Sequence, residues 1–246
     1  ALLVSLLPFG VFAEETTNIS DVPQFGGPSS VGGSLNEDAR KKEPAFRFES
    51  IDNFLQPYFD HKARMNKEHG FAYGFDYTAM YQGASDSPGE DNAFGGIFRA
   101  FGSWTLTGWE SGNTGSIVYK VENRHKLGTD IPPQDLGFEI GYVGFTAPIY
   151  ADYGWGLTNL YWQHKMRDGK LNYVVGQIDN TDFLDLYGLI NPQTAFMNLN
   201  FSTNPSIGIP DQGFGGYGGI ALSENFYIVA GLMDAGGSQD KPGQSL

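Results

Sequence analysis

The stretch from Phe71 to Gln82, FAYGFDYTAMYQ, alternates without a break between aromatic residues and small or polar ones. In an extended strand, successive side chains point to opposite faces. One face of this stretch therefore carries Phe and Tyr, and the other carries residues such as Gly74, Asp76 and Gln82. A soluble sandwich packs a mostly aliphatic face into its core, whereas an aromatic outer face over a polar inner face suits a lipid-facing barrel strand. The stretch therefore predicts a transmembrane β-strand.

Similar runs continue to the end of the chain at the close spacing of an all-β meander. Short turns such as Asp168-Gly169 alternate with longer polar connections such as 83–93 and 127–135, an asymmetry typical of outer-membrane barrels. The expected fold class is all-β, a transmembrane antiparallel β-barrel. The predicted strands are Phe71–Gln82, Gly96–Trp109, Gly115–His125, Gly137–Ala147, Gly156–Lys165, Leu171–Ile178, Gly213–Leu222 and Asn225–Met233.

Composition excludes several classes of function. The chain has no cysteine, which excludes disulfides and thiolate chemistry. Its net charge of -13 argues against a nucleic-acid partner, because phosphates need Lys and Arg to neutralise them. The mean hydropathy of -0.29 does not argue against a barrel, since every second residue of a barrel strand is polar. The 34 glycines and 15% aromatic residues are typical of a barrel rich in Gly and Tyr.

The chain before the first strand divides into three predicted parts. Residues 1–13 resemble the apolar core and cleavage site of a signal peptide, and we expect the sequence to begin within that signal. Residues 14–50 are polar and carry no periodicity, which predicts a flexible lead. Residues 51–70 have apolar residues at helical spacing before Gly70, which predicts one short amphipathic helix. The polar tail 235–246 lacks a closing aromatic strand, so we also expect the barrel to be truncated.

The strand Gly115–His125 places Lys120, Glu122 and Arg124 on one face. One interpretation is a solvated strand face with weak cross-strand salt pairs. The other is the wall of a water-filled lumen, because charges inside a membrane protein belong where water is. Arg99 projects to the same side, and its planar fork of donors could bind paired sugar hydroxyls. The candidates for lining a pore and contacting sugar are Arg99, Lys120, Glu122, Arg124, Asp76 and Glu139.

The segment from Asp179 to Gln212 is too long and too apolar for a simple exposed loop, so we expect it to fold inward. Its Asp179, Asp182 and Asp185 are candidates for a constriction loop. They do not match the spacing of a calcium-binding loop, and helix capping and loop hydrogen bonds are the expected use of these carboxylates. We predict no metal site.

Motif searches nominate no catalytic residue and no cofactor. Gly213 to Gly218 fits the pattern GxGxxG, but the match lies inside a predicted strand with no helix after it. Neither HExxH nor GxSxG occurs. We therefore predict that the protein is not an enzyme.

Several separated blocks, in order from about Phe71 onward, resemble the carbohydrate-selective outer-membrane porins of the OprB family. The blocks are GFDYTAMYQ at 74–82, GSIVYKVENRH at 115–125, LTNLYWQ at 157–163, VVGQID at 174–179, NLNFSTNP at 198–205 and VAGLMDA at 229–235.

The resemblance implies a sixteen-stranded barrel whose narrow, partly Arg-lined channel passes sugars across the bacterial outer membrane by facilitated diffusion. Residues 71–246 would form about its first half. Lys120, Glu122 and Arg124 would lie in the channel wall. The expected partners are sugars and outer-membrane lipid, with a homotrimer as one candidate assembly.

Three alternatives stay open. A sugar hydrolase would need a raised-pKa acid near a second carboxylate, with Asp179, Asp182 and Glu122 as its candidates. A small outer-membrane barrel could act as an anchor or interaction module with a filled interior. A secreted β-sandwich that binds sugar would bury its aromatic residues.

Overall fold

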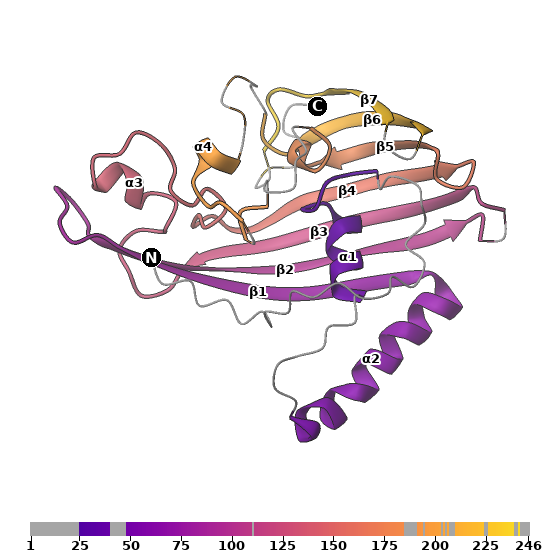
Figure 1. Cartoon of the computed structure of the whole chain (residues 1–246), viewed down its shortest axis with the longest axis horizontal. Coiled ribbons are helices and arrows are strands. Elements are labelled where there is room, and N and C mark those ends of the chain that lie inside the picture. Colours follow the sequence, from indigo (N-terminus) through magenta and orange to yellow (C-terminus); the bar gives the residue numbers. More distant parts are fainter. Residues whose placement is uncertain are drawn as a thin grey trace.

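The protein forms one antiparallel sheet of seven strands in a computed structural model of the chain, in the order β1 to β7 (Figure 1). The structure describes residues 25–39, 48–109, 111–184, 191–193, 195–202, 204, 206, 210–223, 226–238 and 241. Each strand pairs with the next along the chain, and β1 and β7 form the edges. The strands are β1 (Phe71–Gly83), β2 (Asn92–Thr107), β3 (Thr114–Lys126), β4 (Gly154–Met166), β5 (Leu171–Ile178), β6 (Gly213–Ser223) and β7 (Phe226–Met233).

Seven of the predicted strands are confirmed, with bounds that agree to within a few residues. The prediction of a strand at Gly137–Ala147 is wrong. That segment contains the short helix α3 (Leu136–Glu139) followed by turns. Gly141 and Gly144 have φ angles of 80° and 141°, and an extended strand needs negative φ. Alternation in the sequence resembled a strand here, but the backbone conformation of these two glycines interrupts it.

The predicted amphipathic helix is confirmed as α2 (Glu49–His69), which leads directly into β1. Gly70 ends it in the left-handed conformation with φ of 62°, and its N–H donates to the carbonyl of Asn66. A side chain at position 70 would collide with the indole of Trp109. None of the helices in the described ranges is long and apolar enough to cross a membrane.

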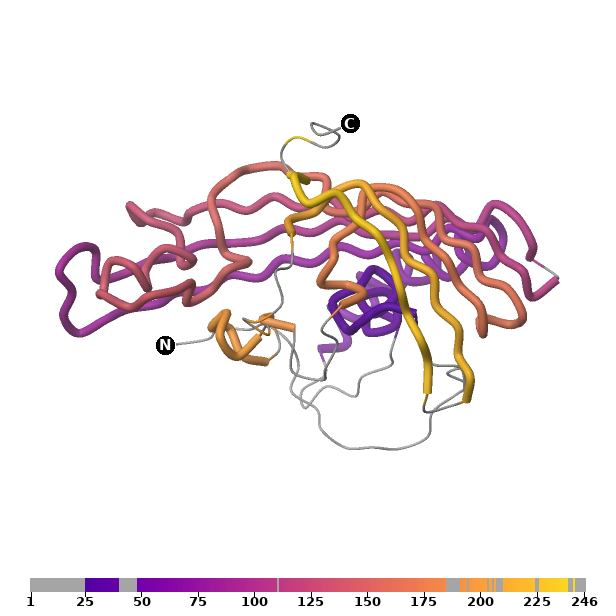
Figure 2. Tube along the Cα trace, turned by 90° about the horizontal axis from the view of Figure 1, so that it is seen from above, coloured from indigo at the N-terminus to yellow at the C-terminus, as the bar shows by residue number. Residues whose placement is uncertain are grey.

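The prediction of a flexible lead over 14–50 is wrong for its central part, because Val31–Ala39 forms the helix α1. This helix lies on the concave side of the curved sheet (Figure 2). Val31 is 0% exposed and belongs to a core cluster with Phe101, Val118 and Val174 on the inner faces of β2, β3 and β5. Burial of Val31 in this cluster fixes a segment whose sequence shows no periodicity. The predicted signal peptide, 1–13, lies outside the described residues.

The two faces of the sheet meet different surroundings. Phe75 and Tyr77 point to the convex side and are 53% and 51% exposed. Large apolar side chains are exposed on this outer face of every strand except β3. The outer set includes Phe75, Tyr77, Tyr81, Trp104, Leu106, Trp155, Leu160, Tyr173, Val175, Phe214, Ile220, Leu222, Phe226, Ile228 and Leu232. The concave face holds the buried side chains.

Connections between strands are short at one end of the sheet and long at the other. At the end where β1 begins, residues 108–113, 167–170 and 224–225 connect the strands. At the opposite end the connections are 84–91, 127–153 and 179–212. The long connections contain α3, the 3₁₀ turn η1 (Asn180–Asp182) and α4 (Leu199–Ser202). This confirms the asymmetry expected from the sequence.

The packing of Val31 predicts how α1 is held. Val31→Asp would place an unpaired carboxylate among Phe101, Val118 and Val174, at a cost of several kcal/mol, and should detach α1 from the sheet. We expect limited proteolysis to cut within 25–39 much faster in this variant. The control is Ala39→Asp, which adds the same charge at the exposed end of α1. Equal cleavage of both variants would contradict the packing.

Candidate functional site

A row of charged side chains crosses the concave face between β1, β2 and β3. Arg99 donates to Asp76 through Nε at 2.8 Å and Nη2 at 2.5 Å, as a two-pronged pair. The register places Asp76 directly across from Arg99, and Arg99 directly across from Glu122. The side chains of Arg99 and Asp76 are 13% and 31% exposed, so this pair reaches water.

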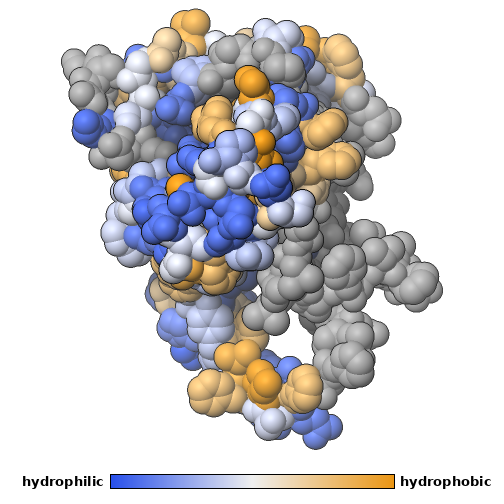
Figure 3. Space-filling model, turned by 90° about the vertical axis from the view of Figure 1, so that its left-hand side faces the viewer, coloured by the Kyte–Doolittle hydropathy of each residue, from blue (hydrophilic) through white to orange (hydrophobic). Residues whose placement is uncertain are grey.

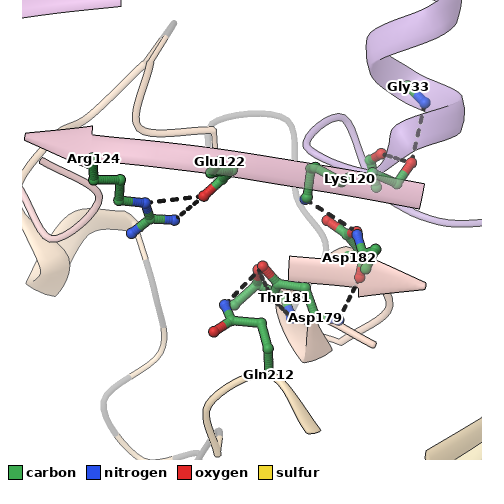
Figure 4. Close-up of polar contacts among 11 residues, drawn as sticks. Gly33, Lys120, Glu122, Arg124, Asp179, Thr181, Asp182 and Gln212 are labelled. Carbon is green, nitrogen blue, oxygen red and sulfur yellow. Dashed lines mark hydrogen bonds and ion pairs between the residues drawn. The ribbon is translucent and has the colours of Figure 1, made fainter. Parts of the chain in front are cut away.

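A second pair lies further along β3. Arg124 donates to Glu122 Oε2 through Nε at 2.9 Å and Nη2 at 2.5 Å (Figure 4). The guanidinium of Arg124 lies over the ring of Tyr153 at 5.1 Å from the ring centre. Both charged residues are buried. A buried charge needs a partner of opposite charge, and Arg124 and Glu122 are partners for each other.

The third charged residue of β3 reaches a different part of the chain. Lys120 Nζ lies 3.5 Å from Asp182 Oδ2, and Asn159 Nδ2 of β4 donates to the same oxygen at 2.8 Å. Asp182 and Asn159 are fully buried, and Lys120 nearly so. This cluster fixes η1 on the concave face, as Figure 4 shows for Lys120 and Asp182.

Asp179 organises the turn that carries Asp182. Its Oδ1 accepts from the backbone N–H of Thr181 at 3.0 Å and from the Thr181 hydroxyl at 2.6 Å. Its Oδ2 accepts from Gln212 Nε2 at 3.0 Å, and its own N–H donates to Asn159 Oδ1 at 2.7 Å. The expectation that this carboxylate caps a helix and makes loop hydrogen bonds is confirmed.

The N-terminal segment covers this cluster. The N–H of Gly27 donates to the carbonyl of Asp182 at 2.7 Å. Phe25 packs on Phe183 with ring centres 5.3 Å apart, and Phe183 stacks on Tyr217 of β6 at 5.2 Å. Two segments far apart in the sequence, 25–39 and 179–184, therefore form one inner layer on the concave face.

The structure brings together most of the residues proposed to line a pore. Lys120, Glu122 and Arg124 share the concave face, but their charged groups are buried: Lys120 pairs with Asp182 of the inner layer, and Arg124 pairs with Glu122. Asp76 is the most exposed member of this row at 31%, and Arg99 beside it is 13% exposed.

Two candidates lie elsewhere or cannot be placed. Glu139 is in α3, where its Oε2 accepts from the N–H of Glu90 at 3.2 Å and so connects two long loops. It does not join the charged row. Asp185 lies outside the described residues.

Sequence reasoning missed several residues of the site. Asn159 contacts both Asp179 and Asp182, and the inner-face alternation of β4 could have identified it. Tyr153 precedes β4, and no pattern places it under Arg124. Thr78 accepts from Gln193 Nε2 at 3.1 Å beside Asp76, a contact between residues 115 positions apart that no local pattern reveals.

Burial controls the electrostatics of the inner turn. Loss of hydration raises the pKa of Asp182 to about 7, and the charge of Asp179 acts in the same direction. Lys120 and the hydrogen bond from Asn159 favour the ionised carboxylate and limit this rise. Burial also raises the pKa of the Tyr153 hydroxyl. Within the described ranges, no group of three or more His, Cys, Asp or Glu could hold a metal ion.

This arrangement can present hydrogen-bonding groups to a solute only where it meets water. That part consists of Asp76, Arg99, Thr78 and Gln193, which offer a carboxylate, a guanidinium, a hydroxyl and an amide. Of the remaining charges, Lys120 pairs with Asp182 and so holds the inner layer on β3, whereas Arg124 and Glu122 pair within β3.

Comparison with known proteins adds no further constraint: no protein-family model, curated protein or solved structure matches this chain.

The raised pKa of Asp182 predicts a pH dependence. The pKa of Asp182 is about 7 in the folded state and 3.8 ordinarily. Between about pH 4 and pH 7 the folded state therefore keeps a proton on Asp182 that the unfolded state has lost. This contribution to the free energy of unfolding should therefore fall as the pH rises from about 4 to about 7. Asp182→Asn should remove the fall. Urea titrations of the wild type and of Asp182→Asn across this pH range would measure the free energy of unfolding. The same pH dependence in both proteins would contradict the raised pKa of Asp182.

Proposed function

We propose that this chain forms part of the wall of an outer-membrane β-barrel that passes sugars by facilitated diffusion. The observation that carries the proposal is the outer face of the sheet, where large apolar side chains are exposed on six of the seven strands. A soluble protein rarely exposes so large a contiguous apolar surface, and lipid is the surrounding that would stabilise it.

Aromatic contacts on the outer face support a membrane position. Near the start of β1, Phe71 contacts Trp104 and Tyr119 across three strands. Toward the other end, Tyr81 contacts Phe94. Aromatic residues are enriched at both interfaces of membrane barrels. A secreted β-sandwich, by contrast, would bury these rings.

The proposed barrel requires more strands than the sheet has. In lipid, every backbone N–H and C=O must be paired, so the edges at β1 and β7 would need partner strands. The resemblance to the OprB family supports sixteen strands in total. It also supports a bacterial outer-membrane location, with a homotrimer as one candidate assembly.

The water-accessible pair Asp76 and Arg99 is the proposed contact for sugar. A guanidinium held flat by a carboxylate keeps donors free for hydroxyl groups of a passing solute. The inner layer of 25–39 and 179–184 would narrow the lumen next to this pair. Selectivity would then arise from width and from hydrogen bonds weak enough to release the sugar.

A second candidate function is an outer-membrane anchor with a filled interior. The burial of Lys120, Glu122 and Arg124 in ion pairs favours it, because a filled interior needs such internal pairs. The two functions share the lipid-facing surface and differ in whether solutes cross, so a permeation experiment separates them.

The lipid-facing surface predicts the effect of a charge at two depths. Leu160 lies in the middle of β4 and Leu222 near the end of β6, and both are exposed on the outer face. Arg near the bilayer midplane costs about 2–4 kcal/mol, and near an interface about 0–1 kcal/mol. Leu160→Arg should therefore decrease the free energy of unfolding in phospholipid vesicles far more than Leu222→Arg does. Equal and small effects would exclude a lipid-facing surface.

The sugar contact predicts a defect in Arg99→Gln. Planar bilayers with the refolded full-length protein, which supplies the remaining strands of the proposed barrel, should show discrete conductance steps that maltose or maltotriose blocks. Loss of a charged donor should weaken this block by on the order of tenfold. Lys170→Gln, which removes the same charge at an exposed turn, should leave it unchanged. A sheet that inserts without conductance would favour the anchor, and an unaltered block in Arg99→Gln would remove Arg99 from the sugar path.

A further inference from the structure

The helix α2 has two chemically distinct faces. Ile51, Phe54, Leu55 and Tyr58 follow the spacing of one helical face. The opposite face carries Asn53, Gln56, Asp60, Arg64 and Lys67. No residue of α2 is buried, and Phe54 is 82% exposed. An apolar face on so exposed a helix requires an apolar partner.

The same face of α2 meets the outer surface of the sheet at one point. The ring of Tyr58 contacts the ring of Tyr73 in β1 with centres 6.4 Å apart. Lys62 Nζ lies 5.4 Å from the centre of the Tyr73 ring and forms an ion pair with Asp38 of α1 at 2.5 Å. Tyr73 belongs to the row of outer-face side chains that begins with Phe71. The apolar row of α2 therefore lies beside the β1 edge, where it contacts Tyr73 of the outer face and Lys62 reaches Asp38 of α1.

The position of α2 matches a membrane boundary. Gly70 turns the chain directly from the helix into β1, at the end of the sheet with the short turns. In Figure 1, α2 projects beyond the β1 edge at this end. Figure 3 shows apolar residues at the bottom of the molecule, where α2 lies, separated from the polar surface of the long-loop end.

We propose that α2 binds the lipid interface beside the short-turn end of the sheet, with Ile51, Phe54 and Leu55 inserted at the boundary between headgroups and acyl chains. An amphipathic helix of this kind lies in the plane of the interface. Arg64 and Lys67 on the opposite face would meet headgroup phosphates. This inference rests on the proposed function, because it requires the outer face of the sheet to be in lipid.

Single cysteine variants test the inference cleanly, because the chain has no native cysteine. Phe54→Cys, Gln56→Cys and Leu160→Cys each receive an environment-sensitive fluorophore in the full chain. The proteins are refolded into vesicles of phosphatidylethanolamine and phosphatidylglycerol, and circular dichroism checks their strand content. Nitroxide lipids quench labels near the headgroups or deep in the acyl chains, and iodide quenches labels in water.

The expected result is shallow-nitroxide quenching at Phe54→Cys about threefold stronger than at Gln56→Cys, with the reverse order for iodide. Leu160→Cys should respond to the deep nitroxide. The label at Leu160→Cys can respond to the nitroxide lipids while the label at Phe54→Cys responds to iodide or to no quencher. Water or protein then covers this face of the helix. That result overturns the inference about α2 and leaves the proposed function standing. If Leu160→Cys responds only to iodide, the membrane function fails and the inference with it.

Discussion

One constraint organises this molecule: each strand has two faces, and the pairing register decides which side chains meet which surroundings. The register aligns Asp76, Arg99 and Glu122 across three strands on the concave face. The same register places Phe75 and Tyr77 on the convex face. A slip of one residue in any pair would move charges into the apolar surface and rings into the polar layer, so both faces select the observed register together.

The concave face shows how buried charge is accommodated. Removing a Lys and a carboxylate from water is costly, and their attraction offsets that cost only when geometry and further hydrogen bonds are good. Lys120 and Asp182 lie 3.5 Å apart, which is long for such a pair, and Asn159 supplies the additional donor. The raised pKa of Asp182 follows from this incomplete compensation. The turn after β5 is therefore held by a contact that is sensitive to protonation.

The inner layer and the outer face point to different aspects of function. The outer face supports the proposed membrane position, since water is a poor solvent for so many exposed rings. The inner layer supports a narrow or filled interior, because 25–39 and 179–184 lie on the concave face, where Asp182 pairs with Lys120 of β3. Among the described side chains of the charged row, Asp76 is the most exposed at 31%, against 13% for Arg99 and 10% for Arg124. The proposed sugar contact rests on the pair Asp76 and Arg99 and on Thr78 and Gln193 beside it.

The sequence by itself determined the strands and their two faces, because period-two alternation is a local property that backbone geometry enforces. It also determined α2 and its end at Gly70, and the capping role of Asp179. Alternation misled at Gly137–Ala147, where Gly141 and Gly144 adopt positive φ. Only the tertiary structure decided that α1 docks through Val31 and that Lys120 meets Asp182, 62 positions away. Such contacts depend on the curvature of the whole sheet, which no local pattern encodes.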